Sequence, residues 1–448
     1  MNDTIAALAT APGPAGVCVV RISGPDALQI ADRLTPHTSH KPSQRAAGTF
    51  FYADIVHPQT QEKIDDALIL VFHAPRSFTG EEVVEIQGHG GSLPAQRLVA
   101  AVLAAGARMA EPGEFSKRAF LNGRMDLTQA EAICDYIQSK SERMAHVARA
   151  QLDGACGSRM TALYEAMLAH CADVEHQLDF DEGELSGTFL LETSQALQQT
   201  MSPLAQMIQS WNHQGCMLRD GALVVLSGKP NAGKSSLLNA LLGRNRAIVH
   251  HVPGTTRDVI EETWLLEGIP IRLVDTAGLR IATDDVEQEG IERTGELMKQ
   301  ADLNLHLVDA VTATDEELAS FPQDARSISV LTKSDLLSTV VNLQHLDEPI
   351  RISAKTGQGL DRLAQAILKK LGVVNASAGI EIINQRHAQE LRTAYTAAEQ
   401  AHTLLAQRNL VIAANELRVS AEALGRIVGR VYSDDLLESI FSRFCVGK

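Results

Sequence analysis

The feature that most constrains the fold is the segment 228–235, which reads G-K-P-N-A-G-K-S and fits the pattern G-x-x-x-x-G-K-[ST]. It follows an apolar run at 223–226 that is typical of a buried strand, and it precedes a helical run. Glycines let the backbone N–H groups turn toward phosphate oxygens, and the helix N-terminus adds a favourable dipole. We expect Lys234 to reach the β- and γ-phosphates and the Ser235 hydroxyl to bind Mg²⁺. The loop therefore predicts a nucleotide-binding domain.

Further motifs follow in the order that a GTPase requires. The D-T-A-G at 275–278 ends a strand-like run, so Asp275 would hold Mg²⁺ through water and the Gly278 amide would face the γ-phosphate. The G-T-T-R-D at 254–258 would supply a threonine to the Mg²⁺ shell. The T-K-S-D at 332–335 would let the Asp335 carboxylate accept hydrogen bonds from guanine N1 and N2. The S-A-K at 353–355 resembles the last guanine-contact loop. The ordered set favours GTP over ATP.

One position departs from the usual base-recognition motif, which begins with Asn where this chain has Thr332. Threonine keeps a hydroxyl that can make part of the same hydrogen bonding. We therefore expect guanine specificity to survive, with an altered affinity.

The pattern along the 448 residues indicates about three domains. Residues 1–118 alternate short apolar runs with turns, and strands are predicted at 17–22, 67–72 and 83–86. Helices are predicted at 130–144, 155–178, 192–211, 381–407, 411–428 and 434–441. Between them, strands at 223–226, 271–274, 303–308 and 328–331 alternate with helical stretches, which is typical of a doubly wound parallel sheet. The sequence thus predicts an α/β domain inserted into a helical domain.

Composition limits the partners and the location. With 40 Lys and Arg against 55 Asp and Glu, the net charge is −15, which on average repels a nucleic-acid backbone. A nucleic acid would therefore have to bind to a local patch of the surface or through another protein. No apolar run approaches the length that spans a bilayer, so no membrane contact is expected. The six scattered cysteines form no C-x-x-C pair and are typical of reduced thiols, which predicts a cytoplasmic protein.

Short motifs spread over the whole chain resemble the MnmE (TrmE) family of tRNA-modification GTPases. They are R-I-S-G at 21–24, S-F-T-G-E-E at 77–82, Q-G-H-G-G at 87–91, E-P-G-E-F-S at 111–116, R-A-F-L-N at 118–122, Q-A-E-A at 129–132, P-G-T-T-R-D at 253–258 and F-C-V-G-K at 444–448. The family tail usually carries Ile where this chain has Val446.

The resemblance implies an architecture and an activity. It implies an N-terminal tetrahydrofolate-binding and dimerisation domain of α+β type (1–118), a helical domain in two halves (119–215 and 376–448) and an inserted TrmE-type G domain (216–375). It implies a homodimeric GTP hydrolase that works with a flavoprotein partner, MnmG, which carries FAD, in a heterotetramer. The pair adds a carboxymethylaminomethyl or aminomethyl group to C5 of the wobble uridine of certain tRNAs. The one-carbon donor is 5-formyl- or 5,10-methylene-tetrahydrofolate, and tRNA is bound mainly through the complex.

The resemblance also implies how the G domain binds and hydrolyses GTP. Leu279 stands where Ras-like enzymes place a water-orienting Gln, and the family uses a glutamate that matches Glu287. Glu287, acting through a bridging water, and Lys234 are the predicted catalytic residues; an ordinary exposed helix glutamate is the alternative for Glu287. The implied GTP-binding set comprises Asn231, Ala232, Gly233, Lys234, Ser235, Ser236, His250, His251, Val252, Pro253, Gly254, Thr255, Thr256, Asp275, Thr276, Ala277, Gly278, Thr332, Lys333, Asp335, Ser353, Ala354 and Lys355.

The resemblance implies two metal ions in the G domain. Ser235 and Thr256 would bind Mg²⁺. No arginine finger is identifiable. In its place the family uses K⁺, and its G domains meet across the dimer. The implied K⁺ ligands are the Asn231 side chain and the backbone of His250, Val252 and Thr255. Hydrolysis is therefore expected to be much faster in K⁺ than in Na⁺.

The family's folate contacts map to Arg21, Glu85, Arg124 and Lys448. The family often has Lys where this chain has Arg124, which keeps the charge but changes the donor geometry. Lys448 would have to fold back onto the N-terminal domain, and we expect it to do so across a dimer. Cys445 could take part in one-carbon transfer or be an idle thiol.

Two other functions stay open from the sequence. A ribosome-assembly or signalling GTPase would share this type of G domain but usually adds a basic RNA-binding domain, which this chain lacks. A folate sensor that uses the G domain as a switch would bind folate without any chemistry on tRNA.

Overall fold

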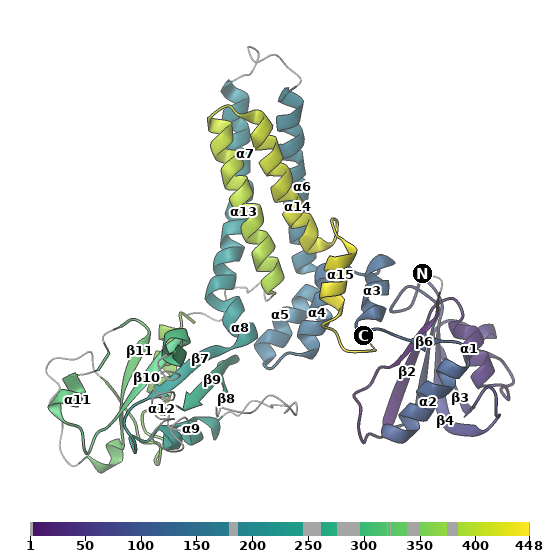
Figure 1. Ribbon diagram of the computed structural model, residues 1–448, viewed down its shortest axis with the longest axis horizontal. Coiled ribbons are helices and arrows are strands. Elements are labelled where there is room, and N and C mark those ends of the chain that lie inside the picture. Colours follow the sequence, from purple (N-terminus) through teal and green to yellow (C-terminus); the bar gives the residue numbers. More distant parts are fainter. Residues whose placement is uncertain are drawn as a thin grey trace, which may run out of the picture. The chain divides into compact units, whose positions relative to one another are not determined.

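The computed structural model of the chain describes residues 3–178, 187–244, 261–275, 296–319, 321–322, 324–337, 349–373 and 384–447 (Figure 1). The chain divides into two compact units. The first comprises Met1–Cys134, Leu152–Ala162 and Gly425–Lys448, and the second comprises Asp135–Gln151 and Leu163–Leu424.

The first unit contains a six-stranded sheet in the order β3-β4-β5-β2-β1-β6. Its strands are β1 (Ile5–Leu8), β2 (Val17–Ser23), β3 (Thr49–Val56), β4 (Lys63–Phe72), β5 (Val83–His89) and β6 (Arg108–Met109). Only β1 and β6 pair in parallel; the other neighbours are antiparallel. The strands predicted at 17–22, 67–72 and 83–86 are confirmed within β2, β4 and β5.

Helices cover one face of this sheet. Side chains alternate across a strand, so Val20 and Ile86 point to the face where they pack with Leu98 and other residues of α1 (Ala27–Leu34) and α2 (Ser92–Ala104). On the opposite face, Phe50 and Tyr52 of β3 are 70% and 69% exposed. The opposite face is therefore exposed at β3, whereas at β1 it is covered, because Ile5 and Ala7 pack there with Phe115 of α3 (Glu114–Leu121).

Both ends of the chain contribute to the first unit. α3 and α4 (Leu127–Ile137) meet α15 (Asp434–Phe441), which matches the helix predicted at 434–441. The Ser433 hydroxyl accepts a hydrogen bond from the Leu436 amide and caps α15. Their common core is formed by Leu127, Ala130, Leu437, Ile440, Phe441 and Phe444.

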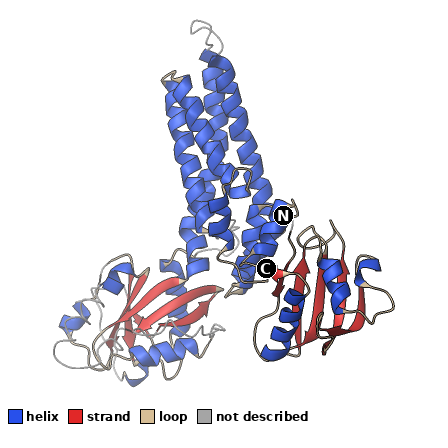
Figure 2. Cartoon of the chain, turned by 45° about the vertical axis from the view of Figure 1, so that its right-hand side comes forward, coloured by secondary structure: helices blue, strands red, loops and turns tan. Residues whose placement is uncertain are grey.

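Four long helices form a bundle: α6 (Ala155–Leu178), α7 (Gly187–Ser210), α13 (Gln385–Ala406) and α14 (Leu410–Val428) (Figures 1 and 2). Polar side chains tie the helices together. The Ser420 hydroxyl donates to the Ala394 carbonyl at 2.8 Å, and the Ser194 hydroxyl lies 2.8 Å from His402 Nε2. The Ser194–His402 contact joins α7 to α13, so the two halves of the helical region, far apart in sequence, lie side by side in one bundle, as predicted.

The single helix predicted over 130–144 is wrong, because α4 ends at Ile137 and α5 (Glu142–Leu152) begins after a break. The Ser139 hydroxyl donates to the Tyr136 carbonyl at 2.7 Å. The Ser141 hydroxyl accepts from the Met144 amide at 3.2 Å and starts the new helix. Serines bond the backbone locally in this way and compete with continuous helix.

The second unit contains the predicted α/β domain, whose sheet has the order β12-β11-β10-β7-β9-β8. The strands are β7 (Ala222–Ser227), β8 (Glu261–Leu266), β9 (Ile269–Asp275), β10 (Leu303–Asp309), β11 (Ser327–Thr332) and β12 (Ile350–Arg351). All pairs are parallel except β8 with β9.

Helices flank this sheet. α9 (Lys234–Leu242) and α12 (Leu360–Lys370) share the main core with it, and α11 (Asp315–Ala319) packs in a separate cluster. Strand order reverses at β7, since β9 lies on one side of it and β10 on the other. In such sheets ligands bind beyond the carboxyl ends of the strands at this switch point.

Candidate functional site

The loop between β7 and α9 is shaped by backbone conformations that glycine favours. Gly228 has φ 141°, and a Cβ built there would overlap the Leu307 carbonyl oxygen of β10. Gly233 has φ 89° and stands at the N-cap of α9. Asn231, at φ 64°, is the loop's non-glycine residue with positive φ and is exposed. The loop is thus tightly seated on the sheet, with its tip facing outward.

Three side chains meet beneath this loop. Lys234 is 5% exposed, and its Nζ donates to the carbonyl oxygens of Gly228 and Lys229 at 2.8 and 2.9 Å. Ser235 Oγ donates to Asp275 Oδ2 at 2.7 Å, which joins the start of α9 to the end of β9. The Lys234 ammonium, the Ser235 hydroxyl and the Asp275 carboxylate therefore lie at one edge of the sheet, although residues 234 and 275 are 41 positions apart in sequence.

The predicted base-recognition loop lies next to the phosphate loop. Thr332 is buried at the end of β11, and its Oγ1 donates to the Ala232 carbonyl at 2.7 Å. Lys333 has φ 57° and its Nζ pairs with Asp309 Oδ2 at 2.6 Å. Asp335 follows in a short 3₁₀ helix and is exposed. This arrangement leaves the Asp335 carboxylate open to a ligand while Thr332 holds the two loops together.

The S-A-K loop comes beside the base-recognition loop through the backbone. The Ser334 amide donates to the Ile352 carbonyl at 3.0 Å, immediately before Ser353. The buried Ser353 hydroxyl accepts from the Thr356 amide at 3.2 Å, whereas Lys355 is exposed.

Sequence reasoning missed Asp309, which anchors Lys333. The signal was available, because Asp309 directly follows an apolar strand at the same carboxyl edge as the other site residues.

Some predicted site residues lie outside the described residues. They are His250, His251, Val252, Pro253, Gly254, Thr255, Thr256, Thr276, Ala277, Gly278, Glu287 and Lys448.

Comparison with known proteins identifies the family. A model described as the GTP-binding protein TrmE N-terminus matches residues 4–124, and a model described as the MnmE helical domain matches residues 127–445. A protein named tRNA modification GTPase MnmE from Dichelobacter nodosus is 42% identical over 100% of this chain and 99% of its own length. Proteins of the same name from Geobacter metallireducens and Vibrio cholerae are 39% and 41% identical, with full coverage of both chains. This chain belongs to the MnmE family.

The MnmE-family candidates for folate binding start from a cross-strand pair. Arg21 of β2 lies opposite Glu85 of β5, and their side chains pair at 2.9 Å on the face of the sheet that points away from α1 and α2. The Arg21 guanidinium also lies over the Phe78 ring, 5.0 Å from its centroid. Its Nη1 is buried and has no hydrogen-bond partner among the described residues. A buried donor without a partner is uncommon and calls for an explanation.

The other predicted contacts lie around the same domain. Arg124 is exposed, and its Nε donates to the Ser77 carbonyl at 3.1 Å, next to Phe78. The Cys445 carbonyl accepts from the Gly113 amide at 3.4 Å, and the Cys445 side chain is exposed. Gly447 approaches the Leu8 carbonyl of β1 closely. Residues 445–447 of the MnmE-type tail therefore lie against the N-terminal domain of the same chain, whereas Lys448, for which the prediction is a contact across a dimer, lies outside the described residues.

A buried ion network, unforeseen from the sequence, holds the region together. Arg118 is 1% exposed and pairs with Asp3 at 2.9 Å, Glu114 at 2.9 Å and Glu81 at 3.3 Å. Burial alone raises the pKa of Glu114, but hydrogen bonds from Arg108, the Glu111 amide and Arg118 outweigh it and hold that pKa below its usual value.

Among the helices that the structure describes, none has both the length and the apolar content needed to cross a membrane.

Proposed function

We propose that this MnmE-family chain hydrolyses GTP and uses the cycle to modify C5 of the wobble uridine in certain tRNAs, together with a flavoprotein partner of the MnmG type. The observation that carries the GTPase part is the assembled edge of the G-domain sheet. There Lys234, the Ser235–Asp275 pair and the loop anchored by Thr332 lie at the switch point of the sheet. Family membership carries the tRNA part.

The residues fit a magnesium nucleotide. Mg²⁺ prefers oxygen ligands, and Ser235 Oγ lies 2.7 Å from Asp275 Oδ2. We assign Ser235 and Thr256 as direct ligands and Asp275 as a ligand through water. When bound, Mg²⁺ neutralises charge on the β- and γ-phosphate oxygens. Lys234 would bind the same oxygens, and Asp335 would accept hydrogen bonds from guanine.

For hydrolysis we assign Glu287 to orient the attacking water through a second water molecule, and Asn231 with the backbone of His250, Val252 and Thr255 to bind K⁺. The exposed Asn231 side chain at the loop tip supports this assignment. Equal rates of GTP hydrolysis in K⁺ and Na⁺ would remove the K⁺ site from the proposal, and a Glu287→Ala variant that turns over at the normal rate would remove Glu287.

We further propose that Arg21, Glu85, Arg124 and Lys448 bind a one-carbon tetrahydrofolate, 5-formyl or 5,10-methylene, and that Cys445 lies beside it. The buried Nη1 of Arg21 supports this, because a carbonyl or carboxylate oxygen of the ligand would supply the acceptor that the described residues do not provide. Isothermal titration with 5-formyl-tetrahydrofolate tests it: Arg21→Met should abolish binding, and Cys445→Ser should leave binding intact while testing the thiol in tRNA modification.

The exposed part of the N-terminal sheet supports a homodimer. Phe50 and Tyr52 of β3 present two aromatic side chains to solvent there, which a second copy of the domain would cover. We propose domain limits of 1–118, 119–215, 216–375 and 376–448, and a cytoplasmic protein, which the six free cysteines support.

Mass spectrometry of tRNA nucleosides from cells with and without the gene tests the whole proposal. Loss of the C5-modified wobble uridines, restored by the normal gene but not by a Lys234→Ala variant, is the expected result. An unchanged nucleoside profile would refute the tRNA function and leave an assembly or signalling GTPase, or a folate-sensing switch.

A further inference from the structure

Lys229, the second residue of the phosphate loop, joins the loop to a helix outside the predicted nucleotide site. Its carbonyl accepts from Lys234 Nζ at 2.9 Å and from the Ala232 amide at 3.2 Å. Its side-chain ammonium leaves the loop and pairs with the Glu317 carboxylate of α11. α11 supplies none of the residues assigned to GTP, so this ion pair ties the part of the loop that holds Lys234 to a separate element.

The helix α11 gives Glu317 a fixed position. Thr314 and Glu317 form a capping box at its start: the Glu317 amide donates to Thr314 Oγ1 at 3.3 Å, and the Thr314 amide donates to Glu317 Oε2 at 3.3 Å. Leu318 of the helix and Phe321 after it are buried against the ends of β10 and β11. The other carboxylate oxygen of Glu317, Oε1, pairs with Lys229. The phosphate loop is therefore held from outside by a carboxylate that is itself anchored to the sheet.

Within the pair, Glu317 is the fixed member. Its side chain is 20% exposed, whereas that of Lys229 is 76% exposed. The hydrogen bonds from Lys229 and from the Thr314 amide hold the pKa of Glu317 below its usual value and outweigh burial, which acts in the opposite direction. The carboxylate is therefore charged at neutral pH. A long, exposed side chain such as that of Lys229 has many rotamers, so the carboxylate determines where this side chain is held.

We propose that Glu317 is a positioning residue for nucleotide binding, which acts through Lys229 on the phosphate loop. The loop binds phosphates with its backbone and with Lys234, so it has to keep one conformation. An interaction that favours the binding conformation of a loop raises the affinity, because it reduces the cost of ordering the loop on binding. The inference rests on the proposed binding of GTP at this loop, and it adds a residue that belongs to no nucleotide-binding motif.

Charge alone and positioning predict opposite effects of the substitution Glu317→Gln. If the carboxylate acts only through its field, removing a negative charge near an anionic ligand should tighten the binding of GDP. If the carboxylate holds the loop through Lys229, the same substitution should weaken binding. Glutamine serves as well as glutamate in a capping box, so α11 itself should stay formed. The sign of the change therefore decides between the two explanations.

Binding and release of a fluorescent GDP analogue by the full chain test the inference. Glu317→Gln should release the analogue about two- to fivefold faster than the normal chain and bind it more weakly by the same factor, because partly exposed ion pairs contribute on this scale. Lys229→Gln should also weaken binding, and adding Glu317→Gln to it should change nothing further, since the two residues act as one pair. Lys229→Arg keeps the cation and should bind within about twofold of the normal chain.

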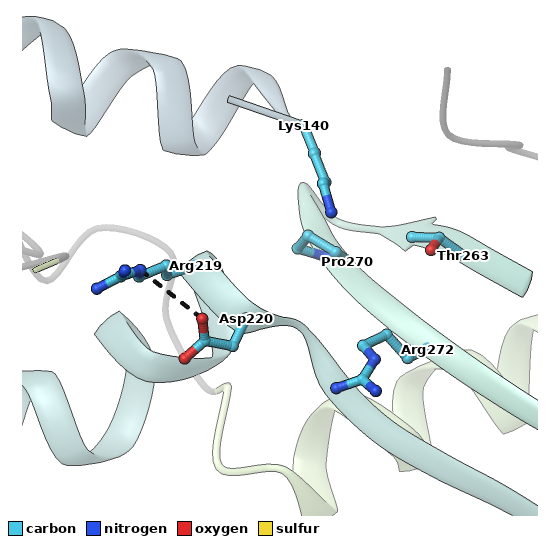
Figure 3. A pocket seen from close by; sticks show the side chains of 6 residues that line it. All are labelled: Lys140, Arg219, Asp220, Thr263, Pro270 and Arg272. Atoms are coloured by element: carbon cyan, nitrogen blue, oxygen red, sulfur yellow. Dashed lines mark ion pairs between the residues drawn. The ribbon is translucent and has the colours of Figure 1, made fainter. Parts of the chain in front are cut away.

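Two substitutions control for the loss of a carboxylate. Glu316→Gln removes the exposed neighbour of Glu317 on α11. Asp220→Asn breaks another ion pair of the second unit, which Asp220 forms with Arg219 at 3.7 Å beside a pocket of about 450 Å³ (Figure 3). Asp220 precedes β7 and the phosphate loop follows β7, so this pair lies at the other end of the strand. Neither substitution should speed up release of the analogue.

Several results would overturn the inference. Glu317→Gln that binds GDP as tightly as the normal chain, or more tightly, would show that the carboxylate does not position the loop. An equal weakening by Glu317→Gln in the Lys229→Gln background would show that Glu317 acts without Lys229. A lower melting temperature of nucleotide-free Glu317→Gln, with Lys229→Gln melting normally, would assign the effect to the stability of α11. If the normal chain binds no GDP, the proposed function fails; if it binds GDP and Glu317→Gln is unaffected, only this inference fails.

Discussion

Replacing Thr332 by valine should weaken nucleotide binding although residue 332 need not touch the nucleotide. Thr332 is 4% exposed, and its hydroxyl lies 2.7 Å from the Ala232 carbonyl and 3.2 Å from the Val308 carbonyl. Valine has nearly the same shape but no donor. The substitution therefore removes the bond that joins the base-recognition loop to the phosphate loop and leaves the Ala232 carbonyl without its side-chain donor.

The size of the effect follows from this burial. Leaving a buried acceptor unsatisfied costs about 1–3 kcal/mol. If the cost falls on the conformation that binds nucleotide, it corresponds to about 5- to 150-fold in affinity, at 1.4 kcal/mol per tenfold. If it falls on the fold of the G domain instead, the nucleotide-free protein should melt at a lower temperature.

Two measurements distinguish these cases. Titration with a fluorescent GDP analogue gives the affinity, and a thermal melt without nucleotide gives the stability. Thr332→Ser keeps the hydroxyl and should bind GDP within about twofold of the normal chain, the size of a few tenths of a kcal/mol. A Thr332→Val protein that binds GDP as tightly as normal and melts at the normal temperature would refute the reasoning.

Three further predictions concern single positions. Gly228→Ala should abolish nucleotide binding, because its Cβ would overlap a backbone carbonyl of β10, whereas Gly16→Ala, with open space around it, should bind normally in the same GDP titration. Arg118→Met should destabilise the N-terminal domain by about 1–3 kcal/mol, since it removes a buried guanidinium that bonds Asp3, Glu81 and Glu114, while Arg108 still pairs with Asp3 and Glu114; hydrogen exchange of β1 and α3 should rise, and unchanged protection would contradict this. The pKa of Glu114, raised by burial but lowered more by Arg108 and its other partners, lies below its ordinary 4.5. Its contribution to stability is therefore complete above about pH 4.5 and is lost as the pH falls through the lowered value, so Glu114→Gln should show a shallower acid-unfolding curve by circular dichroism.

Local patterns were enough to predict the parts of the fold that depend on near neighbours. The strand–loop–helix at 222–242 follows from an apolar run, positive-φ glycines and a helix former, all within a short stretch of chain. The end helix 434–441 and the long helix 155–178 follow in the same way from local composition. The helix break at 138–141 shows the limit of this reasoning, because high helix propensity on both sides concealed two serines that bond the backbone instead.

Contacts between distant segments were not predictable from residue types alone. Arg118 and Asp3 are separated by 115 positions, and Arg21 and Glu85 by 64. Each pair depends on strand register and on how α3 returns to β1, which no local pattern encodes. The family resemblance named Arg21 and Glu85, but their pairing, and the missing partner of Arg21 Nη1, came only from the structure.

The phosphate loop is held ready for its ligand by its own backbone. The buried Lys234 ammonium bonds two carbonyl oxygens of the loop at 2.8 and 2.9 Å, so the backbone of the loop solvates its charge. A phosphate offers charged oxygens in place of neutral ones, and charge-assisted bonds of this kind are roughly twice as strong. Binding thus exchanges weaker bonds for stronger ones without first exposing a buried cation.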